Sequence, residues 1–191
     1  MKSKIILSGA LLMLLGPPVF AADKSEGEAQ FLSRVRQLTL EGRRSGEGYF
    51  SPDGKNIIFQ SERETGNPFY QIYTMSLESG DVRRVSPGFG KTTCSFFRPG
   101  ADEVLFATSH LDKEARAKQK AELDFRASGK SRRYSWDYDV HMDIFSTKRD
   151  GSNLKRLTSA MGYDAEGVYS PDGKKVVFCS IRDAYGKAIL T

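Results

Sequence analysis

Residues 50–55 read Phe-Ser-Pro-Asp-Gly-Lys and lead, after one further residue, into the apolar run Ile-Ile-Phe at 57–59. The pattern returns as Tyr-Ser-Pro-Asp-Gly-Lys at 169–174, followed by Val-Val-Phe at 176–178. Proline fits the second position of a tight turn, and glycine supplies the positive φ with which the chain re-enters a hairpin. The apolar run is typical of a strand buried on both faces. Each copy therefore predicts a turn between two antiparallel strands.

A degenerate copy, Phe-Arg-Pro-Gly at 97–100, lies between these two, so that it is the second of three in chain order. It has one extra residue in its turn. The three turn prolines are separated by 47 and 72 residues. A second motif, Arg-x-Leu-Thr or a close variant, shows the same two separations at residues 36–39, 83–86 and 155–158. Agreement between two unrelated motifs indicates a repeat of about 47 residues, whose second copy carries an insertion of about 25 residues.

The first two copies in chain order each supply four short predicted strands, the third of these strands at residues 71–75 and 143–146. Four antiparallel strands per repeat of this length are typical of a propeller blade. A β-sandwich is the alternative, but sandwiches do not usually repeat one turn at one separation. We therefore predict an all-β chain, a β-propeller of four-stranded antiparallel blades that is incomplete, with about two and a half blades and one helical insertion.

Together these motifs resemble the TolB-like, WD40-like β-propeller repeat family over about residues 34–191. The resemblance implies a periplasmic or extracellular propeller related to Tol biopolymer-transport components. The motifs identify the repeat rather than a function, because propellers are scaffolds for many activities. TolB itself has an α/β domain before its propeller. Only about a dozen residues separate Ala21 from the first expected strand, so the Tol–Pal partner set is not carried over to this chain.

The N-terminus has the layout of a secretory signal peptide. Lys2 and Lys4 precede an apolar run over residues 5–15, and Gly-Pro-Pro and Ala21 follow it. The run is too short to span a bilayer, although an uncleaved anchor is the alternative. We expect a signal peptide at 1–21, a linker at 22–33, and a partial propeller at 34–191 with its insertion at about 111–137. The expected location is the periplasm or the exterior, without stable membrane insertion after cleavage.

The repeat count predicts an N-terminal fragment of a longer propeller. A lone fourth strand is expected at residues 34–39, and the third copy contains only its first two strands. Propellers usually close with 4–8 blades, and an open blade exposes unpaired strand edges. Closure by association of several copies of the chain is the alternative.

The first strand of each copy begins nearest the central axis of a propeller, so charged residues there are candidates for a binding site. We expect them to line an axial mouth that binds a polar ligand or peptide, the alternative being charges that are simply solvated. These candidates are Arg44, Glu47, Lys91, Asp164 and Glu166.

The insertion supplies a second candidate surface. Residues 112–127 are rich in strong helix formers and predict a helix that ends at Ser128-Gly129. The segment that follows is rich in Arg and aromatic residues, which often carry the energy of an interface. The alternative is a loop whose aromatic side chains pack on the blade. The candidates are Arg132, Arg133, Tyr134 and Trp136.

The cysteines and histidines give weaker indications. Cys94 and Cys179 lie in apolar runs, so we expect small core residues, with a disulfide as the alternative. His110 and His141 flank the insertion and Asp143 is nearby, but this set lacks the tight spacing of a metal site. We therefore expect neither a metal nor a cofactor.

Composition narrows the functional class. Apolar residues make up 39% and charged residues 28% of the chain, which fits a soluble globular protein. The net charge of +5 includes two lysines of the signal peptide and gives no reason to invoke nucleic acid. Gly-Arg-Arg-Ser-Gly at 42–46 lacks the spacing of a Gly-x-Ser-x-Gly nucleophile elbow. We expect a non-catalytic module that binds an envelope protein, peptide or glycan. The alternative is the N-terminal propeller of a secreted peptidase or other hydrolase whose catalytic domain lies beyond Thr191.

Overall fold

The computed structural model describes residues 25–28, 30–133, 135 and 137–183. The expected signal peptide at 1–21 lies outside the described residues. The chain divides into two units, Met1–Leu38 and Thr39–Thr191. The first contains the short helix α1 (Ser25–Glu28), and the second contains all the described strands and a longer helix. Within the described ranges, no helix is both long and apolar enough to cross a membrane.

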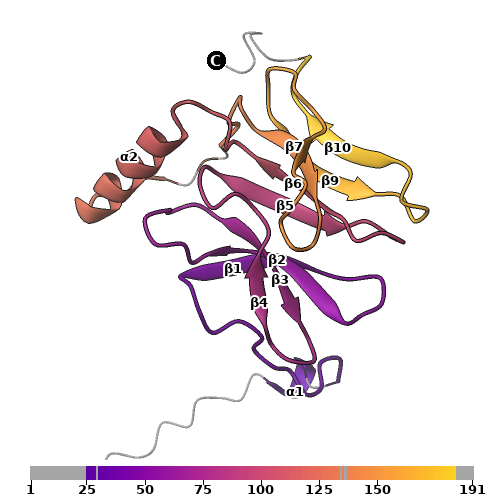
Figure 1. Cartoon of the computed structure of the whole chain (residues 1–191). Coiled ribbons are helices and arrows are strands. Elements are labelled where there is room, and N and C mark those ends of the chain that lie inside the picture. The colour runs from indigo at the N-terminus through magenta and orange to yellow at the C-terminus, as the bar shows by residue number, and fades with distance from the viewer. Residues whose placement is uncertain (1–24, 29, 134, 136, 184–191) are drawn as a thin grey trace, which may run out of the picture. The chain divides into compact units, whose positions relative to one another are not determined.

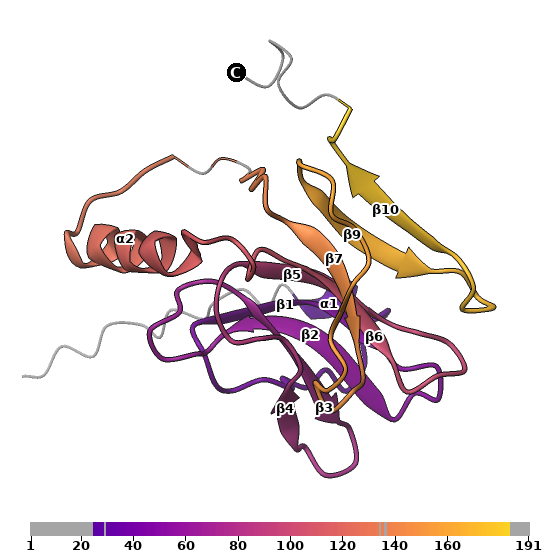
Figure 2. The same ribbon diagram turned by 45° about the horizontal axis from the view of Figure 1, so that its top comes forward.

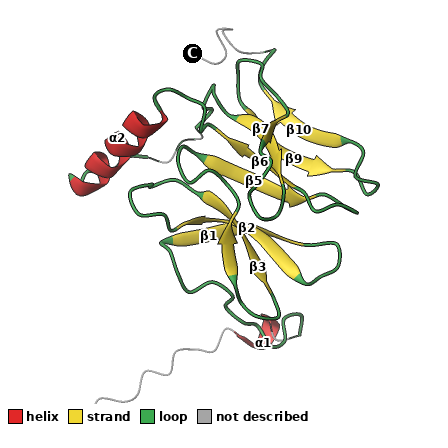
Figure 3. Ribbon diagram, in the orientation of Figure 1, coloured by secondary structure: helices red, strands yellow, loops and turns green. Residues whose placement is uncertain are grey.

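The strands of the second unit form two four-stranded antiparallel sheets and one antiparallel pair (Figures 1 and 3). The first sheet, blade 1, has its strands in the order of the chain: β1 (Arg44–Phe50), β2 (Asn56–Glu62), β3 (Gln71–Ser76) and β4 (Val82–Arg84). Blade 2 follows the same order: β5 (Thr92–Phe97), β6 (Val104–Thr108), β7 (Asp143–Thr147) and β8 (Lys155–Arg156). The pair, blade 3, consists of β9 (Asp164–Tyr169) and β10 (Val176–Ser180).

The blades stack through apolar faces, with the inner strands side by side: β1 lies next to β5, and β5 lies next to β9. Side chains from β2 and β3 pack between blades 1 and 2 against side chains from β5, β6 and β7. A second layer joins blade 2 to blade 3 around Leu105, Ile144 and Tyr169. This arrangement confirms the predicted fold class, an incomplete β-propeller of four-stranded antiparallel blades.

The Ser-Pro-Asp-Gly turns close in the same way in blades 1 and 3. The Ser51 hydroxyl donates to the Asp53 carboxylate and accepts the backbone N–H of Asn56 at 2.9 Å. The Ser170 hydroxyl does the same with Asp172 and with the N–H of Lys175 at 3.0 Å. The motif recurs because its serine and aspartate satisfy the polar groups of the turn, which the flanking strands leave without ladder partners.

The Arg-x-Leu-Thr motif also has a repeated structural role. The hydroxyl of Ser86 accepts the backbone N–H of Ile72 at 2.9 Å, and the hydroxyl of Thr158 accepts that of Ile144 at 2.9 Å. Strand four is short in both blades, and its last hydroxyl takes the place of a further ladder bond. The motif therefore ties the outer strand to strand three where the backbone ladder ends.

The insertion between β6 and β7 contains α2 (Ala115–Ala127), as its composition predicted. The helix ends at Ser128, and Gly129 adopts the positive φ of +68° common after a helix C-terminus. Gln119 accepts the N–H of Gly90 and donates to the carbonyl of Gly66. Both ribbon views accordingly place α2 beside the loops at one end of the blades rather than over a sheet face (Figures 1 and 2).

One predicted strand is absent. Residues 34–39, expected as a lone fourth strand, have no strand conformation in the structure. Arg34 has a φ of +55°, which breaks the extended backbone that a strand requires. Among the described residues no third strand pairs with this segment, and the motif that marks strand four elsewhere forms no strand without such a partner.

Candidate functional site

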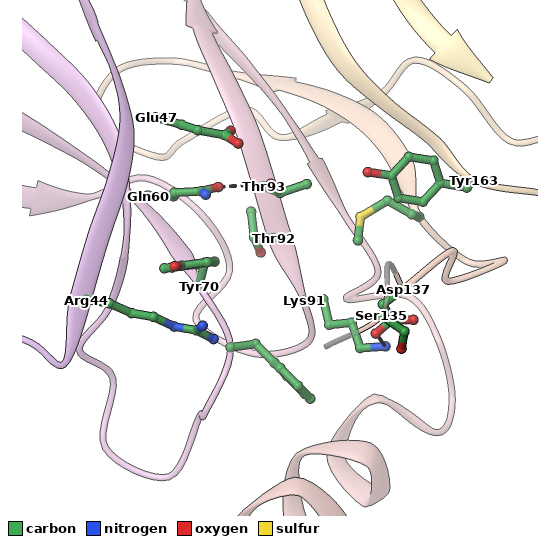
Figure 4. Close-up of a pocket in the computed structure, with 12 residues that line it drawn as sticks. Arg44, Glu47, Gln60, Tyr70, Lys91, Thr92, Thr93, Ser135, Asp137 and Tyr163 are labelled. Carbon is green, nitrogen blue, oxygen red and sulfur yellow. Dashed lines mark hydrogen bonds and ion pairs between the residues drawn. The ribbon is translucent and has the colours of Figure 1, made fainter. Parts of the chain in front are cut away.

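A cavity of about 290 Å³, here called the axial pocket, opens where the inner strands β1 and β5 begin (Figure 4). Its wall combines blade 1, the segments that enter β3, β5, β7 and β9, and the end of the insertion. Six of its lining residues supply most of its polar chemistry and aromatic surface: Arg44, Glu47, Gln60, Tyr70, Lys91 and Tyr163.

Three of the five axial-mouth candidates line this pocket: Arg44, Glu47 and Lys91. Glu166 lines a neighbouring cavity of about 220 Å³, which it shares with Glu47. Asp164 reaches neither cavity, because it is 0% exposed and its carboxylate is held by Arg182 and by the Ser180 hydroxyl. Asp164 therefore has a structural role within blade 3 and does not line the axial mouth.

A β-bulge in each inner strand positions the candidates. Glu47, Cys94 and Glu166 have φ values of +46°, +52° and +58°, and each lies at the register shift of its strand. A positive φ is uncommon for residues other than glycine, and bulges often re-aim a side chain next to a functional site. All three residues line the smaller cavity. Their separations of 47 and 72 residues equal those of the turn prolines. The same spacing could therefore have identified Cys94, which the sequence analysis did not place at the mouth.

Arg44 lies at one end of a chain of alternating charges. Its Nε donates to Glu62 at 2.9 Å, and Glu62 also accepts Arg126 of α2 at 2.5 Å. Arg126 pairs with Glu122, which pairs in turn with Arg132. These contacts hold the pKa of Glu122 below its usual range although burial acts in the opposite direction. The network joins the pocket to the insertion helix.

Lys91 is neutralised by two carboxylates from the end of the insertion. Its Nζ lies 2.5 Å from Asp137 and 2.9 Å from Asp139. Asp139 also accepts Lys118 at 3.1 Å, and Lys118 reaches Asp112 at 2.7 Å. Burial would raise the pKa of Asp139, but the hydrogen bond and the charge of Lys91 hold it below the usual range. This network fastens both ends of the insertion beside the pocket.

Aromatic rings and neutral polar groups complete the wall. The guanidinium of Arg44 lies 4.6 Å from the ring centroid of Tyr70, and Lys91 Nζ lies 5.5 Å from that of Phe69. The Gln60 side chain accepts the Thr93 hydroxyl at 2.9 Å. Figure 4 shows Arg44 and Glu47 on the blade 1 side and Tyr163 on the opposite side. The aromatic residues were not among the sequence candidates, because they lie in connecting segments outside the repeat motifs.

The proposed insertion surface is described only in part, because Tyr134 and Trp136 lie outside the described residues. Arg132 pairs with Glu122 and stacks over the ring of Phe125, with its guanidinium carbon 4.6 Å from the ring centroid. Arg133 is exposed. Arg132 therefore braces α2 in addition to contributing to the surface.

Neither cysteine forms a disulfide, and neither is a core residue. Cys94 is half-buried at the smaller cavity, and Cys179 is exposed on β10. The expected core position fails because the bulge turns Cys94 toward the cavity and because Cys179 lies on the open face of blade 3. Burial raises the pKa of the Cys94 thiol to about 12. A thiol with that pKa is a poor nucleophile at neutral pH.

The residues considered for a metal site have other partners. The His110 ring packs edge-on against Phe145, with ring centroids 4.7 Å apart, and burial lowers its pKa. His141 lies 3.7 Å from Asp112, and Asp143 pairs with Arg156 at 2.5 Å. In the part of the chain that the structure describes, no group of three or more His, Cys, Asp or Glu is arranged to hold a metal ion.

The fold and the pocket define the class of protein: a partial β-propeller with a polar pocket where its inner strands begin. No family model matches the chain. A solved structure described as a TolB candidate from Agrobacterium tumefaciens shares the fold, with a TM-score of 0.52 and 24% identity over 75% of this chain and 40% of that one. A TolB homolog of Chlorobium luteolum is 28% identical over 144 residues, which are 68% of this chain and 32% of that protein. The chain is thus TolB-like, as its repeat motif indicated.

Two other curated relatives have less defined roles. The uncharacterized peptidase YuxL of Bacillus subtilis is 29% identical over 154 residues, or 71% of this chain and 22% of that protein. The uncharacterized protein Atu1656 of Agrobacterium fabrum is 25% identical over 131 residues, or 69% and 34%. The chain spans well under half the length of each of these three curated relatives.

Proposed function

We propose that this chain is part of an exported, TolB-like propeller that acts as a non-catalytic module binding a protein, peptide or glycan of the cell envelope. The likeness to a TolB homolog supports the envelope setting, and the signal-peptide pattern supports export. The observation that carries the binding role is the axial pocket. Metal, cofactor and nucleic acid have no part in the proposal.

The pocket suits binding for three reasons. It is concave, and Phe69, Tyr70 and Tyr163 place aromatic rings in its wall. Its polar groups come from separate segments that the blade sheets and ion-pair networks hold in place, so little ordering remains to be done on binding. Cys94, which lines the neighbouring smaller cavity, has a thiol whose raised pKa does not suit nucleophilic catalysis.

The proposal is tested by the double variant Glu47→Gln/Glu166→Gln of the exported chain. Immobilised protein is incubated with periplasmic extract and, separately, with purified cell-wall glycan, and retained material is quantified. The control is Glu78→Gln, an exposed substitution in the turn between β3 and β4 at a residue that lines neither cavity. Retention that falls in the double variant and persists in the control supports the proposal. Equal retention by wild type and double variant overturns it.

The second candidate function is the N-terminal propeller of a secreted hydrolase. The similarity to a protein named as a peptidase, of which the chain matches 22%, favours it. The genomic reading frame after codon 191 decides between the two. Further Ser-Pro-Asp-Gly repeats followed by a stop support the binding module. A continuation into a Gly-x-Ser-x-Gly domain makes this propeller an accessory to an enzyme.

A further inference from the structure

The axial pocket contains a positive charge that the protein neutralises only in part. In the charge network of Arg44, three guanidinium groups share only two carboxylates, those of Glu62 and Glu122. Arg44 uses its Nε for Glu62, and its side chain remains 52% exposed. Its two terminal nitrogens have no hydrogen-bond partner among the described residues. Such a guanidinium fork matches the two oxygens of a carboxylate.

The same pocket contains a negative charge without a cationic partner. Glu47 follows Arg44 by three residues on β1, and the bulge turns it toward the two cavities. Glu47 shares the smaller cavity with Cys94, and its carboxylate forms no ion pair within the described part of the chain. Arg44 and Glu47 therefore do not neutralise each other although both line the pocket. Lys91, in contrast, is fully occupied by Asp137 and Asp139.

The size and the walls of the pocket restrict what can bridge these two charges. A volume of about 290 Å³ is at the small end of the range for ligand sites, so it suits a small molecule or the end of a chain. Phe69, Tyr70, Met142 and Tyr163 provide apolar surface between the charged groups. A ligand that matches this volume, these two charges and this apolar surface has an anionic group, a cationic group and an apolar body.

We propose that the axial pocket binds small zwitterions of the class of free α-amino acids and short peptides with both termini charged. The carboxylate lies at the Arg44 fork, the ammonium group at Glu47, and an apolar side chain against the aromatic wall. This inference rests on the proposed binding function and specifies the ligand chemistry of the same pocket. A neutral glycan could hydrogen-bond both groups but would supply an opposite charge to neither, and charge-assisted hydrogen bonds are the stronger ones.

The test uses L-phenylalanine and the dipeptide Gly-Phe as probes, with binding measured by isothermal titration calorimetry on the exported chain. N-acetyl-L-phenylalanine lacks the ammonium charge, and L-phenylalanine amide lacks the carboxylate. We expect at least one zwitterion to bind about tenfold or more tightly than its blocked forms, since charge-assisted hydrogen bonds are the stronger ones.

Variants assign each charge to its residue. Arg44→Gln should abolish the preference over the amide and keep the preference over the N-acetyl form. Glu47→Gln should do the reverse, and Glu78→Gln should change neither. The comparison of blocked ligands on wild-type protein remains decisive if a variant fails to fold.

Two results overturn the inference. One is the absence of binding by either zwitterion up to about 10 mM, beyond the millimolar limit of weak recognition. The other is equal affinity for the zwitterions and their blocked forms. If either occurs while retention of envelope material still depends on Glu47 and Glu166, the proposed binding function stands and only the zwitterion assignment fails.

Discussion

Blades 2 and 3 place the same repeat residue in opposite environments. Leu105 in β6 and Val177 in β10 occupy the same position of the apolar strand-two motif. Leu105 is 0% exposed because blade 3 packs on it, whereas Val177 is 70% exposed. Ile58, the equivalent residue of blade 1, is also fully buried, against blade 2. The repeat therefore encodes a face to be covered, and the neighbouring blade provides the cover.

The aromatic residue at the end of strand one packs in the opposite direction, toward the preceding blade. Phe97 and Tyr169 pack back against the preceding blade, and both are buried. Phe50, their counterpart in blade 1, is 65% exposed. Strand two thus presents its middle residue to the following blade, and strand one presents its final aromatic residue to the preceding one. Propeller blades of this kind interlock in one direction around the axis.

The largest expected effect is the difference in stability loss between substitutions at the buried Leu105 and at the exposed Val177. Leu105→Ala should lower the free energy of unfolding by about 2–5 kcal/mol, because it leaves a cavity between blades. Val177→Ala should change it by about 0.5 kcal/mol or less, as for most surface substitutions. Urea denaturation followed by circular dichroism measures both. Equal effects would mean that the open face of blade 3 is covered in solution.

The insertion of blade 2 gives the next prediction. Asp139→Asn should destabilise the protein by about 1–3 kcal/mol near neutral pH, since it removes the buried carboxylate that Lys91 and Lys118 share and leaves each lysine with one carboxylate, Asp137 or Asp112. The pKa of Asp139 is lowered in the folded protein, so its stabilising contribution is present above the unfolded-state pKa and is lost as the pH falls through the folded-state pKa.

The measurement for Asp139 is urea denaturation of wild type and variant at several pH values. The difference between them should shrink as the pH falls below about 4, the ordinary carboxyl range. A difference that does not change with pH would contradict the ion-pair explanation and indicate lost packing instead.

A smaller effect is expected where strand four is tied to strand three. Ser86→Ala removes a buried hydroxyl that accepts the Ile72 N–H and donates to Gln71. The expected cost is about 1–2 kcal/mol, because both partners are left buried. Thr158→Val removes the corresponding bond in blade 2 and serves as the matched comparison. Hydrogen exchange locates the effect. The Ile72 amide should lose protection in Ser86→Ala, and the Ile144 amide should lose protection in Thr158→Val.

The last prediction concerns the rates at which the two cysteine thiols are chemically modified. Cys179 is exposed, and Glu166 raises the pKa of its thiol, whereas Cys94 is half-buried and burial raises the pKa of its thiol to about 12. Iodoacetamide at pH 8 should therefore modify Cys179 about tenfold or more faster than Cys94, since the thiolate is the nucleophile. Peptide mass spectrometry over time distinguishes the two sites. Faster modification of Cys94 would show that the smaller cavity is more open than the structure indicates.

The strands could be predicted from the sequence because their determinants are local. The Ser-Pro-Asp-Gly turn satisfies its own backbone, and the apolar strand that follows is recognisable wherever it occurs. The helix of the insertion was predictable for the same reason, since its residues are strong helix formers. The strand expected at residues 34–39 fails because a strand depends on a partner that its own sequence does not supply.

The sequence alone thus determined the repeat, the blade strands, the turns and three charged residues of the axial pocket. Only the tertiary structure decided that Asp164 is buried, that the bulges bring Glu47, Cys94 and Glu166 to one cavity, and that Arg44 and Glu47 keep unmatched charges. Turns and strand patterns depend on neighbours along the chain. Burial and the neutralisation of charge depend on groups distant in sequence, which only packing brings together.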